Sequence, residues 1–181
     1  TKGGHNYATD LGQQIHKLNK GQYLHDVVEV DNKPDFCIGV AGYPEKHIES
    51  PSLHSDLLRL KEKVDAGADY VVTQMFFDNQ RYFEFVNKAR EMGITIPIIP
   101  GIKPLAIQKH LQLLPQVFKI DLPEALIKEV NTCSSNAQIR QIGVEWAIQQ
   151  SKELLDFGVP VLHYYSMGKS DNIKAIASQL F

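Results

Sequence analysis

A phenol and an imidazole follow a short apolar run in this chain. Residues 36–41 are rich in strand-forming side chains, and a Gly-Tyr-Pro turn and a polar tail come directly after them. Such a run predicts a buried strand of a parallel sheet, with Tyr43 and His47 at its carboxyl end. Because ligands bind at that end of the strands in α/β proteins, both are candidate site residues. The simpler alternatives are a wall position for Tyr43 and solvent exposure for His47.

Polar side chains also occur in two further apolar runs. Gln74 ends one of them, and a buried amide there must find hydrogen-bond partners, so a binding role and a structural role are both open. His163 lies within the run 159–165, where we expect a core histidine. Tyr164 and Tyr165 must point to opposite faces of that strand, one toward the helices and the other toward the opposite face.

A helix expected over 52–67 places charges of both signs on one flank. Its apolar stripe, which should pack on the sheet, consists of Leu53, Leu57, Leu60 and Val64. Asp56, Arg59 and Lys63 fall on one side of that stripe. They could grip a ligand that lies across the helix, such as a ribose and its pyrophosphate. The alternative is a solvated helix face with an ion pair.

Signatures of metal and phosphate sites are weak. His47 could pair with Glu49 or His54, but no further ligand stands at metal spacing, so we expect no metal. The chain has no Walker loop, no GxGxxG after a strand and no GxSxG elbow. Nucleotide-binding and hydrolase classes that depend on these loops are therefore not indicated.

Charge and hydropathy exclude other classes. The formal net charge is -2 and no Lys/Arg-rich run occurs, so nucleic acid is not an expected partner. The apolar runs are too short to span a bilayer, and the chain does not open on a signal-peptide pattern. We therefore expect no membrane association and a cytoplasmic location, with Cys37 and Cys133 as buried, reduced thiols.

Strand and helix patterns alternate along the chain. We expect strands at 36–41, 69–74, 94–99 and 159–165, and helices at 10–20, 52–67, 79–93, 105–114, 135–156 and 170–180, with another short helix after Pro123. Asn79 is the expected N-cap of the third helix. This alternation predicts an α/β fold with a parallel sheet covered by helices.

Two architectures fit this element order. One is a small doubly wound sheet, and the other is about half of a TIM (β/α)8 barrel, because a complete barrel needs about 250 residues. The chain begins with Thr rather than Met. We take this as favouring a piece of a larger barrel.

The order and spacing of six motifs resemble the methylenetetrahydrofolate reductase family. They are YATDL at 7–11, VAGYPEKH at 40–47, DLLRLKEKVDAGA at 56–68, TQMFFD at 73–78, PIIPGI at 97–102 and HYY at 163–165. Each motif is weak alone, but together they are specific and cover nearly all of the chain. The resemblance implies the last four βα units of an FAD-dependent βα-barrel, with residues 1–181 as the C-terminal half of one domain.

The resemblance also implies an activity. Members of the family reduce methylenetetrahydrofolate to methyltetrahydrofolate for methionine biosynthesis, within one-carbon metabolism and tetrahydrofolate interconversion. The hydride passes by a ping-pong route from NADH or NADPH to N5 of FAD and then to the folate, so nicotinamide and folate use one face in turn. The protein orients the cofactor and tunes its electronics. Members are often homo-oligomers, and we expect the same here.

Site residues follow by matching motif positions. The cofactor-binding set implied is Tyr7, Ala8, Tyr43, His47, Asp56 and Lys63, to which the helix flank adds Arg59. The substrate-binding set implied is Gln74, His110, Tyr165 and Lys169. Three positions depart from the common pattern. Lys169 stands where an Arg is usual and lacks its bidentate fork, Glu62 replaces a basic residue, and His110 replaces an amide.

Two parts of the family's site have no counterpart in this sequence. These are the general-acid Glu near the end of the first barrel strand and the Arg-Gly-Asp segment that contacts FAD. We therefore assign no catalytic residue here and expect the chain to be inactive alone. The alternatives are a non-catalytic half-barrel module that binds a nucleotide or self-assembles, and a lyase or aldolase that uses Lys103 or Lys169 as a Schiff base.

Overall fold

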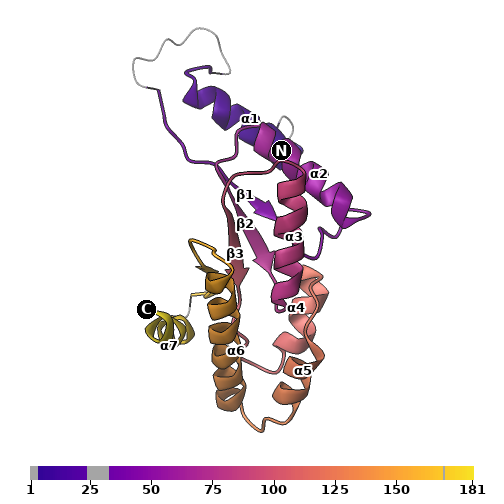
Figure 1. The fold of residues 1–181 in the computed structure, drawn as a ribbon, viewed down its shortest axis with the longest axis vertical. Coiled ribbons are helices and arrows are strands. Elements are labelled where there is room, and N and C mark those ends of the chain that lie inside the picture. Colours follow the sequence, from indigo (N-terminus) through magenta and orange to yellow (C-terminus); the bar gives the residue numbers. More distant parts are fainter. Residues whose placement is uncertain (1–3, 24–32, 169) are drawn as a thin grey trace.

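The computed structural model describes residues 4–23, 33–168 and 170–181, and strands and helices alternate through most of it (Figure 1). The strands are β1 (Gly39–Gly42), β2 (Tyr70–Met75), β3 (Ile98–Ile102) and β4 (His163–Tyr164). The helices are α1 (Ala8–Asn19), α2 (Leu53–Asp65), α3 (Asn79–Glu91), α4 (His110–Phe118), α5 (Glu124–Asn131), α6 (Asn136–Asp156) and α7 (Asp171–Leu180). None of these helices combines the length and the apolar character needed to cross a membrane.

The four strands form one parallel sheet in the order β1-β2-β3-β4, which is also their order in the chain. Gly39 pairs with Tyr70 at one edge of the sheet, and Gly101 pairs with His163 at the other. Parallel neighbours need a crossover, and helices supply it between each pair of strands. The predicted α/β class and parallel sheet are confirmed.

One face of the sheet is covered by helices. The side chains of β2 alternate between buried and half-buried, as expected for a strand with two different faces. The main core joins Leu57 of α2, Val71 of β2, Phe85 of α3, Ile102 of β3 and Leu154 of α6. The apolar stripe predicted for α2 is confirmed, because its two central leucines are buried and its two ends pack against this core.

A second apolar cluster holds α4 and α5 beside the carboxyl ends of the strands. It joins Met75 of β2 to Leu105, Leu114, Leu126 and Ile139. In Figure 1, α4 and α5 lie beyond the lower ends of the strands, next to α6. Helices α4 and α5 therefore form one wall at the end of the sheet where a ligand is expected.

Side-chain caps fix where three helices begin. Ser52 accepts a hydrogen bond from the backbone nitrogen of the third residue of α2 at 3.1 Å, and Ser135 does the same for α6 at 3.3 Å. The cap of α3 is Asp78, which accepts from the backbone nitrogen of Gln80 at 2.9 Å. The prediction that Asn79 caps this helix is wrong: Asn79 is its first residue and is buried.

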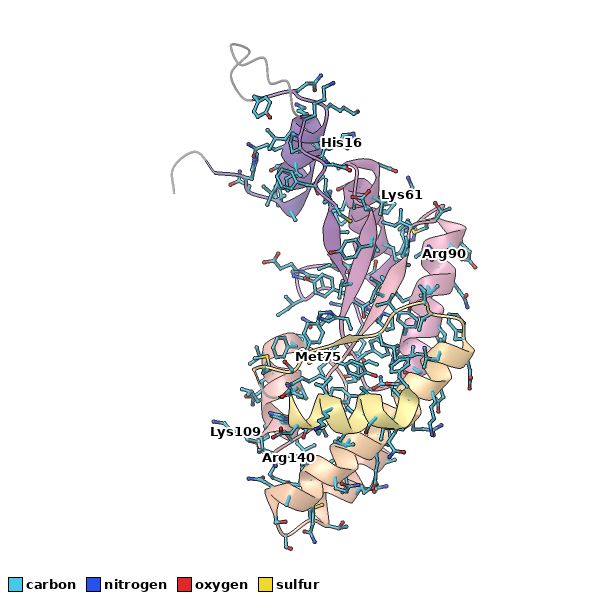
Figure 2. All side chains as sticks on the ribbon, turned by 90° about the vertical axis from the view of Figure 1, so that its left-hand side faces the viewer. His16, Lys61, Met75, Arg90, Lys109 and Arg140 are labelled. Atoms are coloured by element: carbon cyan, nitrogen blue, oxygen red, sulfur yellow. The ribbon has the colours of Figure 1, made fainter. Side chains whose placement is uncertain are left out.

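Strand β3 begins later than the predicted 94–99. Ile94 is buried and its nitrogen donates to the carbonyl of Ala89, so it belongs to the turn that follows α3 and does not start a strand. Arg90, labelled at the end of α3 in Figure 2, binds the carbonyls of Ile94 and Ile96. These contacts occupy the segment before the strand, and pairing with β2 starts only at Ile98.

Other boundaries differ at the edges of the sheet. Only His163 and Tyr164 of the predicted run 159–165 are strand, and His163 is exposed rather than a core histidine. Cys37 is also exposed and Cys133 is half-buried, which corrects the expected buried thiols. His163 lies in the edge strand β4 and Cys37 just before the edge strand β1, and no further strand covers either edge among the described residues. The expected helix at 105–114 begins only at His110.

Candidate functional site

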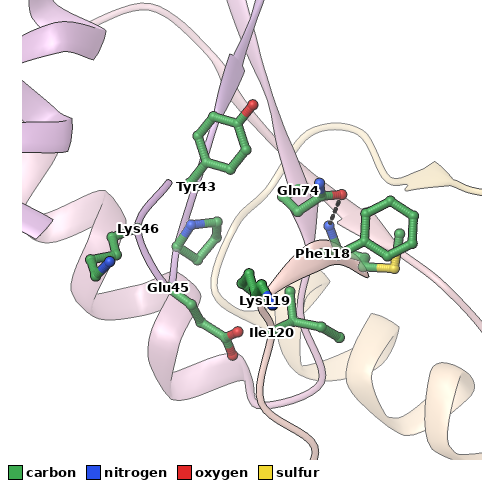
Figure 3. A pocket seen from close by; sticks show the side chains of 9 residues that line it. Tyr43, Glu45, Lys46, Gln74, Phe118, Lys119 and Ile120 are labelled. Atoms are coloured by element: carbon green, nitrogen blue, oxygen red, sulfur yellow. Dashed lines mark hydrogen bonds between the residues drawn. The ribbon is translucent and has the colours of Figure 1, made fainter. Parts of the chain in front are cut away.

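Tyr43, Gln74 and Tyr165 all lie at the carboxyl end of the sheet, where the parallel strands end. The ring of Tyr43, just after β1, packs edge to face on His47 with centroids 4.7 Å apart. The hydroxyl of Tyr165 donates to the Thr73 carbonyl at 2.9 Å. Gln74 is half-buried rather than buried, and its Oε1 accepts from the next residue's backbone nitrogen at 3.1 Å. Tyr43 and Gln74 line the same narrow hollow (Figure 3).

Asp56 organises the loop after β1. Its carboxylate accepts from the backbone nitrogen of His47 at 3.1 Å and from the Ser50 hydroxyl at 2.9 Å, and the residue is only 8% exposed. Burial, and then the nearby negative charge of Asp56, raise the pKa of Tyr43. Tyr43 therefore stays protonated and can both donate and accept a hydrogen bond.

The three charged residues predicted on one flank of α2 do not all face the same surroundings. Lys63 reaches the Ala41 carbonyl of β1, and burial lowers the pKa of its ammonium although Asp56 opposes that effect. Arg59 instead faces solvent and pairs with Glu62 at 2.9 Å. Asp56 and Lys63 thus lie against the strand mouth, whereas Arg59 forms the exposed ion pair that was the alternative interpretation of this flank.

The N-terminal candidates lie on the outer side of α2. Tyr7 precedes α1, is 73% exposed, and its backbone nitrogen donates to Asp10 at 3.2 Å. Ala8 is the exposed first residue of α1, which packs against α2. Glu62, and to a smaller extent Tyr7, raise the pKa of Arg59, so Tyr7 lies near this guanidinium. The structure therefore places Tyr7 and its neighbour Ala8 beside Arg59 on the outer side of α2.

The substrate candidates gather around the end of β3. His110 begins α4, and its Nδ1 accepts from the backbone nitrogen of Ala106 at 3.2 Å. Burial, and then the charge of Lys103, lower the pKa of His110. Lys103 donates from Nζ to the Tyr165 carbonyl at 3.0 Å and is 9% exposed. Lys169 lies outside the described residues.

The sequence places Lys103 in the loop after the third expected strand, where it was a candidate Schiff-base lysine. In the structure it follows β3 directly and is buried, and burial lowers the pKa of its ammonium. A binding role on the substrate side was not assigned to it from the sequence. The cation lies beside Tyr165 and His110, so it adds a positive charge to the predicted substrate side.

Glu45 is a second residue that the sequence interpretation missed. Its Oε2 accepts from the backbone nitrogen of Asp121 at 2.8 Å, which ties the loop after β1 to the segment between α4 and α5. Oε1 is buried and meets no donor among the described residues. Burial raises the pKa of Glu45 to about 7. Glu45 also lines the hollow of Figure 3, whose walls come from three separate parts of the chain, residues 43–46, 74–75 and 118–120.

The arrangement of side chains at the strand mouth indicates what kind of ligand it can bind. A parallel α/β sheet presents two tyrosines, an amide and buried charges at one strand mouth, which suits a polar, partly aromatic ligand. Within the residues that the structure describes, no group of three or more His, Cys, Asp or Glu side chains could hold a metal ion.

A family model described as methylenetetrahydrofolate reductase matches residues 2–181. The chain therefore belongs to the methylenetetrahydrofolate reductase family, and the family resemblance seen in the sequence is confirmed. The chain is 36% identical over 147 residues to a probable methylenetetrahydrofolate reductase (NADPH) of Caenorhabditis elegans, covering 80% of this chain and 22% of that protein. It is 33% identical over 189 residues to methylenetetrahydrofolate reductase (NADH) 1 of Zea mays, covering 99% and 30%.

A bacterial relative is matched over more of its length. The 5,10-methylenetetrahydrofolate reductase of Escherichia coli is 35% identical over 160 residues, which is 87% of this chain and 54% of that protein. The chain thus spans about a quarter of the two eukaryotic relatives and about half of the bacterial one. Among solved structures, a Clostridium thermocellum protein described as binding two copies of 5-methyl-5,6,7,8-tetrahydrofolic acid has a TM-score of 0.58 at 23% identity, with 81% of this chain and 53% of that chain covered. At that identity the likeness concerns the fold.

Proposed function

We propose that the protein containing this chain reduces methylenetetrahydrofolate to methyltetrahydrofolate, with FAD as cofactor and NADH or NADPH as hydride donor. The family match over residues 2–181 carries this proposal. Relatives named for NADH and for NADPH both support the reaction, and they leave the choice of donor open. A ping-pong order fits a single strand mouth that must serve the two substrates in turn.

We further propose that the chain is the last half of a TIM (β/α)8 barrel. Four parallel strands in chain order, with helices on one face, are what four consecutive units of such a barrel provide. The sequence contains no counterpart of the family's general-acid Glu, so the isolated chain should not turn over. A cytoplasmic location and a homo-oligomeric state stay predictions.

The residues near β1 suit a flavin nucleotide. Ala41 leaves an exposed strip at the end of β1 that carries only a small side chain, and Lys63 lies beside it with its ammonium on the Ala41 carbonyl; the ring of Tyr70 lies next to Gly39 and borders this strip. Tyr43 and His47 would flank a flat ring system at the end of this strip, and Arg59 would offer a solvent-facing cation to a phosphate. When bound, FAD would supply the hydride-accepting and hydride-donating chemistry, which no side chain of this set can provide.

The opposite side of the mouth suits a folate. Gln74 offers an amide to a pterin or nicotinamide ring, and Tyr165 is held in place by its bond to a β2 carbonyl. Lys103 and His110 lie close to each other beyond Tyr165. The buried ammonium of Lys103 gives this side a positive charge that would attract a substrate carboxylate, although as a point charge it does not supply the bidentate fork of an Arg.

FAD titration of the chain tests the cofactor part of this proposal. We expect saturable quenching of flavin fluorescence, weakened about tenfold in Lys63→Met, which loses a cation beside the strip (about 1.4 kcal/mol). Lys61→Met is the matched control, because Lys61 is on the same helix and pairs with Asp65 instead. Equal weakening in both variants, or no saturable binding to the unmodified chain, would contradict a flavin half-site on β1.

A self-assembling half-barrel is the second candidate. The sheet face opposite the helices is only half covered, as the half-buried side chains of Tyr70, Val72 and Gln74 show. Sedimentation velocity over a range of concentrations discriminates between the two functions. A concentration-dependent dimer that binds no FAD favours the assembly module.

A further inference from the structure

A second cavity lies outside the strand mouth, between the start of α3, the middle of α6 and the segment before α5. Its volume is about 280 Å³, near the lower end of the range for small-molecule pockets (about 300–1,000 Å³). Phe77, Pro123 and Trp146 form its apolar walls. Trp146 is fixed there, because its indole nitrogen donates to the Phe77 carbonyl at 3.1 Å. None of the groups proposed to bind flavin or folate lines this cavity.

The amide donors around the cavity are already engaged within the chain. Asn79 Nδ2 donates to the Gln150 carbonyl at 3.1 Å and to Glu153 Oε2 at 2.7 Å. Gln149 Nε2 donates to Glu153 Oε1 at 2.9 Å, and Gln150 Nε2 donates to the Phe76 carbonyl at 3.0 Å. The side chains that line this cavity therefore have little left to donate to a ligand.

The groups around the cavity that can still bind a ligand are hydrogen-bond acceptors and negative charges. Asn79 is 7% exposed, and its Oδ1 has no donor among the described residues. Its orientation is fixed, because turning the amide over would place Oδ1 against the two acceptors that Nδ2 now bonds. Asp78 and Glu153 add two carboxylates, and none of the described lining residues carries a positive charge. Asp78 also caps α3, so the positive end of that helix is already neutralised.

We propose that this cavity binds a small organic cation, an amidinium or primary ammonium on a flat apolar body. A donor-rich cation would meet the carboxylates of Asp78 and Glu153, while its apolar body would lie against the indole of Trp146. The site is independent of the proposed reductase function, because it lies in the helical layer and not at the strand mouth.

Trp146 is the only tryptophan in the chain, so its emission and its single indole N–H resonance report directly on this cavity. The probe is benzamidine, with neutral benzamide of nearly the same shape as the comparison. We expect benzamidine to shift both signals saturably and benzamide to bind at least tenfold more weakly. Equal affinities for the two probes, or no saturable shift with benzamidine, would overturn the proposal.

Two variants locate the charge that matters. Glu153→Gln keeps the shape and should weaken benzamidine binding about tenfold, since a hydrogen bond to a charged group is lost. Glu145→Gln is the control, because Glu145 is exposed on the same helix and bonds only Gln141. Asp78→Asn retains a helix-capping side chain and should weaken binding as well. If Glu153→Gln and Glu145→Gln bind benzamidine equally, the cavity does not select for positive charge.

Discussion

Replacement of Glu45 by glutamine should change how the stability of the chain depends on pH. The ordinary pKa of this carboxyl is 4.5, and in the folded chain burial raises it to about 7. The hydrogen bond from the Asp121 backbone and the positive charge of Arg81 act against this rise, whereas the negative charges of Asp121 and Asp78 add to it. Between these two pKa values the unfolded chain loses the proton while the folded chain keeps it.

The sign of the effect follows from this difference. A carboxyl with a raised folded-state pKa costs the native chain nothing below pH 4.5, and its penalty grows as the pH rises toward 7. For a fully buried group, a pKa change of this size corresponds to about 3 kcal/mol; because Glu45 is only partly buried, solvent screening reduces it to about 2 kcal/mol. Glu45→Gln stays neutral and can still accept from the Asp121 nitrogen. It should therefore be only about 0.5 kcal/mol more stable than the wild type at pH 5 and about 2 kcal/mol more stable at pH 8.

Urea denaturation at pH 5, 6, 7 and 8, followed by circular dichroism, measures this difference directly. Other titrating groups cancel when the variant is subtracted from the wild type at each pH. Glu49→Gln is the control, because Glu49 is exposed on the same loop. A Glu45→Gln difference that is the same at pH 5 and pH 8 would refute the reasoning, since it would show that Glu45 is ionised in the folded chain at both.

Two further perturbations test the packing. Tyr82→Phe removes a buried hydroxyl that donates to the Ile98 carbonyl at 2.6 Å, and it should lower the free energy of unfolding by about 1–2 kcal/mol, read from the urea midpoint. Gly143→Ala should destabilise the chain severely, because an added Cβ would lie 2.1 Å from the Leu105 carbonyl oxygen. Gly12→Ala meets nothing within 4 Å inside α1 and should instead stabilise the chain by about 0.5–1 kcal/mol, so a similar thermal shift in both alanine variants would contradict the close approach at α6.

The elements that the sequence predicts best are those with a long, regular apolar period. The spacing of Leu57 and Leu60 in α2 predicts a buried stripe, and the structure contains it. Ile94 looks like the start of a strand from its neighbours alone, yet it packs in the turn that follows α3, where its nitrogen bonds the Ala89 carbonyl and its own carbonyl accepts from Arg90. Local β propensity was overridden there by the contacts that end the helix.

The candidate site was also predicted only in part. Tyr43, Gln74 and Tyr165 were predicted at strand ends, and the structure brings them to the carboxyl end of the sheet. Their ligands stay predictions. Glu45 could not be assigned a role from sequence, because its hydrogen-bond partner Asp121 lies 76 residues further along the chain. His163 was misjudged for a related reason, since no local pattern shows that β4 stops after two residues at the edge of the sheet.

The brevity of β4 sets the order in which the sheet should open. Strands β1, β2 and β3 are each joined by a single helix, but β4 follows three helices, so its pairing must close the longest loop in the sheet. Within the sheet ladder it recovers that entropy through two residue pairs, Gly101 with His163 and Ile102 with Tyr164. Amide protons on this edge, such as that of Tyr165, should therefore exchange with solvent through partial opening, while that of Val71 waits for global unfolding. The edge that carries the predicted folate contacts is thus the most easily remodelled part of the sheet.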